Sequence, residues 1–177
     1  MKKIDVQVGI DLSMRSSAIC LSTDEKVYEF FIYQPQEKIY EKLILENIDF
    51  YETLLKHLLT KYNFTKVNIE GLSLNSKSAV LDIICTNHWT FRMILYKLGF
   101  EYNTPAPREW RKHFNIQDGR KIKDLKIEFG AAKFWKIITF NKLNKRVKND
   151  ILTFCSDNDL IGDSRYDLAD SYFISRF

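Results

Sequence analysis

The sequence predicts an α/β fold in which helices flank a five-stranded mixed sheet. Three alternating apolar segments, 4–12, 17–22 and 26–33, are separated by short polar turns, and this spacing is typical of an antiparallel meander. Two further strand segments, 66–70 and 100–104, enclose a helical pattern. A strand–helix–strand order favours parallel pairing, so the expected sheet has three antiparallel strands and then two parallel ones.

Helices are expected between and after these strands, because apolar residues recur there at helical spacing. Ser76 can cap the second helix and Gly99 can end it, whereas Pro107 suits the first position of a short third helix. The expected helices cover residues 37–62, 76–98, 107–114, 146–156 and 164–177.

The chain of 177 residues has the length of one domain, and neither a repeat nor an interdomain linker divides it. We therefore expect a single domain over residues 1–177, with a basic, partly helical insertion at about 115–145. No apolar run approaches the roughly 18–20 residues that cross a membrane. The N-terminal segment does not have the pattern of a signal peptide. These features predict a cytoplasmic protein without a membrane partner.

Positive charge is concentrated between Arg108 and Lys148. These 41 residues contain thirteen Lys and Arg but four Asp and Glu, which gives an excess of nine positive charges. The aromatic residues interleaved with them are Trp110, Phe114, Phe129, Phe134, Trp135 and Phe140. Basic and aromatic residues together are typical of a nucleic-acid-binding surface. The alternative, solvated helix faces whose lysine stems cover the core, agrees equally well with this composition.

Two of the expected strands end in acidic residues. Asp11 ends the first strand, and Glu70 ends the fourth immediately before Gly71. Aspartate is a poor strand former, and burying an unpaired carboxylate costs free energy. If these strands are neighbours in the sheet, both carboxylates emerge at the edge where α/β folds bind ligands. A divalent cation there would neutralise both charges.

Asp167 and Asp170 lie three residues apart in the last helical pattern, so their side chains share one helix face. The small residues Ala169 and Ser171 would let this helix approach the sheet closely. Four carboxylates without His or Cys favour Mg²⁺ over zinc, with Mn²⁺ as a substitute. Such clusters typically hold two ions ~3.5–4 Å apart. A lone Asp-x-x-Asp pair is usually solvated surface, so the metal interpretation depends on all four acids.

Four segments of the chain match, in order and in rough spacing, the motifs of a known group of nucleases. They are GIDLSMRSSAI (9–19), VNIEG (67–71), TPAPREWRKHF (104–114) and RYDLADSYFI (165–174). With these segments the chain resembles the RuvC-like Holliday junction resolvases, especially short phage-type members, within the ribonuclease H-like nuclease superfamily. Much of the superfamily shares the first and last motifs, whereas the Pro-Arg-Glu-Trp segment narrows the likeness to the resolvases.

The resemblance implies roles for particular residues. The catalytic, metal-binding acids would be Asp11, Glu70, Asp167 and Asp170. Arg111 would lie near the scissile phosphate. Lys148 would be a second basic catalytic residue, with Lys145 and Arg146 as alternatives. The residues expected to contact DNA are Asn75, Lys77, Arg108, Arg111, Lys112, Arg146 and Lys148. The polar loop after Glu70 could instead cap the next helix, and Asp163 is expected to cap the last one rather than to bind metal.

By this resemblance the protein is an endodeoxyribonuclease that resolves Holliday junctions, which are four-way DNA junctions, and other branched DNA. It would use two Mg²⁺ ions per active site to hydrolyse phosphodiester bonds, and a homodimer would place paired symmetric nicks. The expected location is the cytoplasm of a bacterial or phage-infected cell, in association with DNA. The second helix could serve the dimer or belong to the core; its apolar residues include Ala79, Ile83, Ile84, Trp89, Met93 and Leu95.

Three other functions compete with this one. Another ribonuclease H-like nuclease, such as one that cuts RNA–DNA hybrids, would use the same acids. A sugar-kinase or actin-like domain also presents an Asp on its first strand, but the six glycines do not form its phosphate-binding loops, so no nucleotide cofactor is expected. A junction-binding protein without catalysis would gain nothing from four clustered carboxylates, because they repel DNA phosphates.

Overall fold

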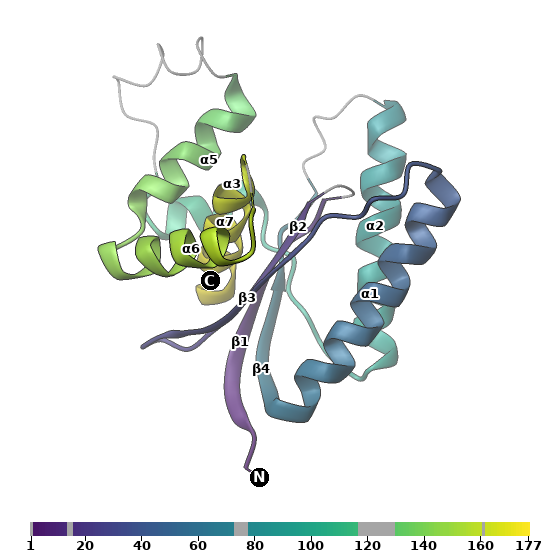
Figure 1. Cartoon of the computed structure of the whole chain (residues 1–177), viewed down its shortest axis with the longest axis horizontal. Helices are drawn as coiled ribbons and strands as arrows, with labels where there is room; N and C mark the ends of the chain where they lie inside the picture. The colour runs from purple at the N-terminus through teal and green to yellow at the C-terminus, as the bar shows by residue number, and fades with distance from the viewer. Residues whose placement is uncertain (1, 14–15, 73–77, 117–129, 161) are drawn as a thin grey trace.

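The computed structural model describes residues 2–13, 16–72, 78–116, 130–160 and 162–177. A four-stranded sheet lies at its centre, in the strand order β3–β2–β1–β4 (Figure 1). The strands are β1 (Ile4–Asp11), β2 (Ser17–Ser22), β3 (Val27–Tyr33) and β4 (Tyr62–Ile69). β2 pairs antiparallel with β1 and β3, whereas β4 pairs in parallel with β1. The predicted mixed sheet is therefore confirmed for its first four strands.

The prediction of a fifth strand at 100–104 is wrong. Asn103 alone pairs with β4, through an isolated parallel bridge to Asn68. The N–H and the carbonyl of Asn103 both bond to the β4 backbone, over 2.9 Å each. Pro105, two residues later, has no N–H with which to continue the ladder. The segment therefore makes one bridge and passes on to the next helix.

The helices are α1 (Tyr40–Lys61), α2 (Ser78–Lys97), α3 (Pro107–His113), α5 (Ala131–Lys142), α6 (Lys145–Asp157) and α7 (Ser164–Arg176). α1 and α2 cover one face of the sheet, and α3, α5, α6 and α7 lie on the other (Figure 1). The predicted helices are confirmed, with ends that differ by a few residues. Within the expected insertion, α5 begins after Gly130, and residues 117–129 lie outside the described part. None of the described helices is both long and apolar enough to cross a membrane.

Alternation along β1 divides its side chains between two cores. Val6, Val8 and Ile10 pack with residues of α1 and α2 in the first core. Successive side chains of a strand point to opposite faces, so Gly9 and Asp11 face the helices on the other side. β4 alternates in the same way, and its Asn68 donates to a carbonyl of α7 over 2.8 Å. The side chain of Glu70 continues this alternation and also lies on the side of α7.

α7 packs directly against the backbone of β1 at Gly9. A β-carbon at this position would lie 2.1 Å from the backbone oxygen of Ser171 and 2.1 Å from the backbone nitrogen of Ser175. The hydroxyl of Ser175 also shares a hydrogen bond of 2.7 Å with that of Ser22 on β2. Small residues on α7 thus allow the close approach that the sequence predicts. This contact holds the acids of α7 over the sheet.

Candidate active site

Four acidic side chains lie at one end of the sheet: Asp11, Glu70, Asp167 and Asp170. Asp11 is the last residue of β1, and Glu70 directly follows β4. Parallel pairing aligns Ile10 with Ile69, and the N–H of Glu70 donates to the carbonyl of Ile10 over 2.8 Å. The two acids of α7 lie one turn apart and are 3% and 2% exposed. The structure therefore brings together the four acids that the sequence singles out.

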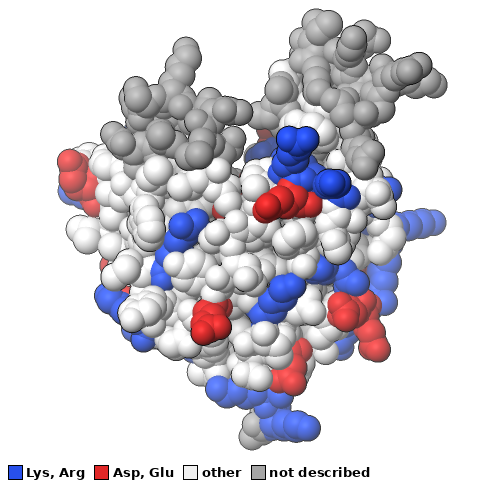
Figure 2. Space-filling model, turned by 180° about the vertical axis from the view of Figure 1, so that it is seen from behind, with Lys and Arg blue, Asp and Glu red and all other residues white. Residues whose placement is uncertain are grey.

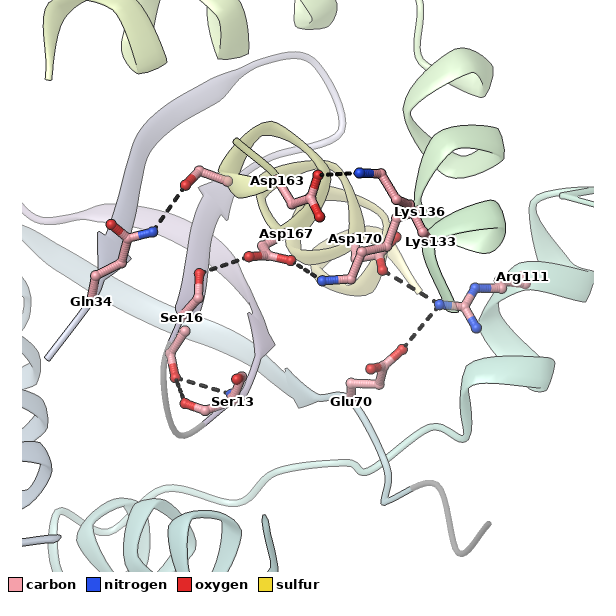
Figure 3. Close-up of polar contacts among 12 residues, drawn as sticks. Ser13, Ser16, Gln34, Glu70, Arg111, Lys133, Lys136, Asp163, Asp167 and Asp170 are labelled. Carbon is pink, nitrogen blue, oxygen red and sulfur yellow. Dashed lines mark hydrogen bonds and ion pairs between the residues drawn. The ribbon is translucent and has the colours of Figure 1, made fainter. Parts of the chain in front are cut away.

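Two basic side chains lie among these acids (Figure 3). Arg111 of α3 forms ion pairs with Glu70 at 3.6 Å and with Asp170 at 3.4 Å. Lys136 of α5 forms an ion pair with Asp167. The side chains of these two bases are 15% and 33% exposed. Each base compensates negative charge that burial would otherwise make costly.

Aromatic rings fix the position of Arg111. The guanidinium lies 4.5 Å from the ring centre of Trp110 and 5.6 Å from that of Trp135. Trp110 is fully buried, and its Nε1 donates to Oε1 of Glu70 over 3.1 Å. An arginine close to two indole rings is stabilised by cation–π interactions and loses freedom of motion. The Pro-Arg-Glu-Trp-Arg segment therefore positions both Arg111 and Glu70.

Ser16, directly before β2, contacts Asp167 from the side opposite Lys136 (Figure 3). The hydroxyl of Ser16 donates to Oδ2 of Asp167 over 2.7 Å (Figure 3). The hydroxyl of Ser17 donates to the carbonyl of Ser13 over 2.7 Å, and that carbonyl also accepts from Nδ2 of Asn87 on α2 over 3.0 Å. Asp167 thus has two partners, a hydroxyl and an amine, from distant parts of the chain.

Burial raises the pKa of three of these acids. For Asp11, burial acts first and the negative charges of Glu70 and Asp167 add to it. Burial and then Asp170 raise the pKa of Glu70 to about 7. Burial and then Asp11 raise the pKa of Asp170 to about 7. The neighbouring bases lower these pKa values but do not cancel the effect of burial.

The raised pKa values predict that the ion-free protein loses stability as pH rises. A carboxyl whose pKa is higher in the folded than in the unfolded state binds more protons when folded, so its stabilising contribution disappears between the two values. For Glu70 that window runs from 4.5 to about 7. We expect the Tm in EDTA to fall as pH is raised from about 5 to about 8.

The control for this pH dependence is Asp11→Asn, which removes one of the three carboxyls with a raised pKa. The Tm of this variant should change less with pH than that of the wild type. The Tm is measured by thermal denaturation in EDTA. A wild-type Tm that rises through the same pH window would contradict raised pKa values for the buried carboxyls.

The donor set suits a hard divalent cation in its chemistry, because Mg²⁺ and Mn²⁺ prefer oxygen ligands. Oδ1 of Asp170 is buried and has no hydrogen-bond partner among the described residues. The hydroxyl of Thr139 lowers the pKa of Asp170 but donates its own proton to the carbonyl of Trp135 over 2.9 Å. Within the described part, no three His, Cys, Asp or Glu residues are spaced to hold a metal ion. Arg111 and Lys136 lie between the carboxylates instead.

The structure does not bring Lys148 to the four acids. Its amine donates to the carbonyl of Asn141, at the end of α5, over 2.9 Å. Arg146 is exposed on α6 and lines a groove against β3. The bases of α6 therefore lie away from the four acids.

Asp163 occupies the N-cap position of α7, but its side chain makes no capping hydrogen bond. It forms an ion pair with Lys133 at 3.5 Å instead.

The other residues expected to contact DNA divide into two groups. Arg108 and Lys112 are exposed on α3, the helix that carries Arg111. Asn75 and Lys77 lie outside the described residues, within the segment 73–77 that follows β4. Arg108 and Lys112 therefore lie on the same helix as Arg111, which contacts the four acids.

Lys136 is a site residue that the sequence did not single out. It belongs to the basic segment between Arg108 and Lys148, which predicted a general nucleic-acid surface rather than one particular base. A local signal was present, because Lys136 interrupts the apolar run at 134–138 as Asp11 interrupts the end of β1. A charged residue inside an apolar run requires a partner of opposite charge when it is buried.

No protein-family model and no curated protein matches the chain. Its structure is similar to that of T. thermophilus RuvC in complex with a Holliday junction substrate, with a TM-score of 0.60 and 8% identity over 98% of this chain and 90% of that one. A second Thermus thermophilus RuvC structure gives a TM-score of 0.57 and 10% identity over 96% and 90% of the two chains.

The yeast mitochondrial Holliday junction resolvase Ydc2 is also similar, with a TM-score of 0.55 and 13% identity over 98% of this chain and 76% of that one. Such low identities show the fold alone, and the narrower likeness to phage-type members stays a prediction. The chain has an α/β, ribonuclease H-like fold similar to that of RuvC and Ydc2.

Proposed function

We propose that this chain is a Mg²⁺-dependent endodeoxyribonuclease that resolves Holliday junctions and other branched DNA, with one nuclease domain over residues 1–177. The observation that carries the proposal is the meeting of four acids and two bases at one end of the sheet. Clustered carboxylates repel DNA phosphates unless cations lie between them, so they suit catalysis better than binding alone. One of the similar structures is that of RuvC in complex with a Holliday junction substrate, and this similarity supports branched DNA as the substrate class.

The four carboxylates are the groups that would hold the ions, with Mn²⁺ able to replace Mg²⁺. Two ions bound there would activate the attacking water and stabilise the leaving oxygen of a phosphodiester. Trp110 orients Glu70 through its indole N–H, and Ser16 orients Asp167 through its hydroxyl. Arg111, which two rings hold in place, is the base that would bind a non-bridging oxygen of the scissile phosphate.

Exposed bases near the site would bind the DNA backbone. Arg108 and Lys112 flank Arg111 in sequence, and we assign them to phosphate contacts together with Asn75 and Lys77. On the face shown in Figure 2, basic and acidic side chains are interspersed rather than gathered by sign. Charge therefore does not mark a DNA-binding surface on this face, and the bases around the four acids are the better guide.

The proposed enzyme is a homodimer, and we assign its contact to the exposed side of α2. Trp89, Met93 and Tyr96 are 58%, 54% and 76% exposed, whereas Leu95 on the same helix is fully buried in the core. Trp89 and Met93 line a groove between α1 and α2. The helix therefore belongs to the core on one side and presents apolar side chains to solvent on the other, as a subunit contact requires.

Met93→Lys is expected to weaken the dimer by at least about tenfold, because a lysine charge would be buried at the contact. Light scattering after size-exclusion chromatography over a range of concentrations measures this change. The control is Leu152→Lys, at a residue of α6 that is 44% exposed, which should leave the mass unchanged. A wild-type protein that stays monomeric at high concentration would contradict the proposed homodimer.

The experiment that tests the function offers the purified protein three substrates in Mg²⁺ or Mn²⁺: a mobile four-way junction, a nicked duplex and an RNA–DNA hybrid. Paired symmetric nicks in the junction are the expected result. Cleavage restricted to the hybrid would overturn the proposal in favour of hybrid cleavage. Tight junction binding without cleavage in either ion would indicate a binding protein instead.

A further inference from the structure

Lys136 holds an unusual position among the proposed metal ligands. Its amine pairs with Asp167, and the charges of Asp11 and Asp170 also act on it. The ammonium of Lys136 therefore occupies an oxygen of Asp167 that the proposed function requires as a metal ligand.

The two bases of the site differ in their freedom to move. Arg111 contacts two acids and lies close to the rings of Trp110 and Trp135, with a side chain that is 15% exposed. Lys136 pairs with one acid and is 33% exposed, and its amine sits on a flexible four-carbon stem. Of the two, Lys136 therefore has fewer contacts that hold it in place.

We propose that Lys136 is an internal counter-cation that a divalent ion must displace from Asp167 when it binds. The inference rests on the proposed function only for the presence of that ion. In the ion-free protein the amine compensates a carboxylate that is nearly inaccessible to water. Once displaced, the amine remains on α5, beside the four acids, and is available to a phosphate. Lys136 thereby links ion binding to the arrival of substrate.

Two substitutions on α5 test this proposal through Mn²⁺ binding without DNA, measured by isothermal titration calorimetry. Lys136→Met removes the competing charge and is expected to tighten Mn²⁺ binding by about tenfold or more. The matched control is Lys133→Met, one turn earlier on the same helix, where the lysine pairs with the exposed Asp163 at 3.5 Å. This control should leave the affinity within about twofold of the wild type.

The outcomes separate this inference from the proposed function. If the wild type binds Mn²⁺ and Lys136→Met binds it no more tightly, only the displacement by the ion is refuted. If neither protein binds Mn²⁺, the metal-dependent function fails as well. Both results are read from binding alone and do not depend on finding the right DNA substrate.

A measurement on the wild type keeps the proposal testable if the variant does not fold. The rate at which acetylating reagents modify Lys136, followed by mass spectrometry, should rise several-fold when Mn²⁺ is added, because a displaced amine is more accessible. Lys133 serves as the reference within the same sample. An unchanged rate at Lys136 under saturating Mn²⁺ would overturn the displacement.

Discussion

Replacing Asp11 by Asn is expected to reduce the rate of junction cleavage by about a thousandfold or more, while junction binding persists. The amide keeps the shape of the carboxylate but removes the charge that faces Glu70 and Asp167. A bound metal ion supplies several kcal/mol of transition-state stabilisation, and each ~1.4 kcal/mol corresponds to a factor of ten in rate. Single-turnover cleavage and a gel-shift assay on the same junction measure the two effects separately.

Asp5→Asn is the matched control, because Asp5 is an exposed aspartate at the other end of β1 that accepts a hydrogen bond of 2.8 Å from Asn63. It should cleave at the wild-type rate. Asp11→Asn should also be at least as stable as the wild type in EDTA, since burial disfavours the Asp11 charge. Metal-dependent cleavage that survives in Asp11→Asn would refute the assigned site.

Gly9→Ala is expected to destabilise the fold by about 3 kcal/mol or more. The added methyl group would lie 2.1 Å from backbone atoms of Ser171 and Ser175, so α7 must shift as a whole because no flexible side chain can yield. Urea denaturation followed by circular dichroism measures the loss. Because α7 carries Asp167 and Asp170, cleavage should be lost together with stability, unlike in Asp11→Asn.

The control for overpacking is Gly99→Ala. Gly99 has a φ of 80° and open space around its α-carbon, so an added methyl group causes backbone strain but no collision. This substitution should cost only about 1–2 kcal/mol. If Gly9→Ala lowers the free energy of unfolding no more than Gly99→Ala does, α7 does not pack against β1 as closely as the structure shows.

Much of the fold could be predicted because its elements have strong periodicity. β1 alternates between two cores, and the apolar residues of α1 recur at helical spacing, so both were predicted within a few residues. The error at 100–104 came from reading an extended segment as a strand. Asn103 makes two backbone hydrogen bonds to β4, but Pro105 has no N–H with which to continue the ladder. The apolar pattern alone does not reveal a missing hydrogen-bond donor.

The site was only partly accessible from the sequence. Asp11 and Glu70 were singled out because acids are rare at the ends of apolar strands, and their proposed roles remain predictions. The bases were harder, because a lysine on a solvated helix face and a lysine buried against a carboxylate look alike in sequence. Lys136 on α5 pairs with Asp167 of α7, whereas Lys148 on α6 bonds to a carbonyl of α5. This difference depends on how the helices pack, and apolar spacing along the chain does not reveal it.

The hydrogen bond between Ser16 and Asp167 joins residues that are 151 positions apart. Contacts of such sequence separation require a long loop to close and are typical of slow folding. The four acids lie together only when α7 has docked against the sheet. A divalent ion bound by these acids, as we propose, would bind the native state alone and, by mass action, should shift the folding equilibrium towards it.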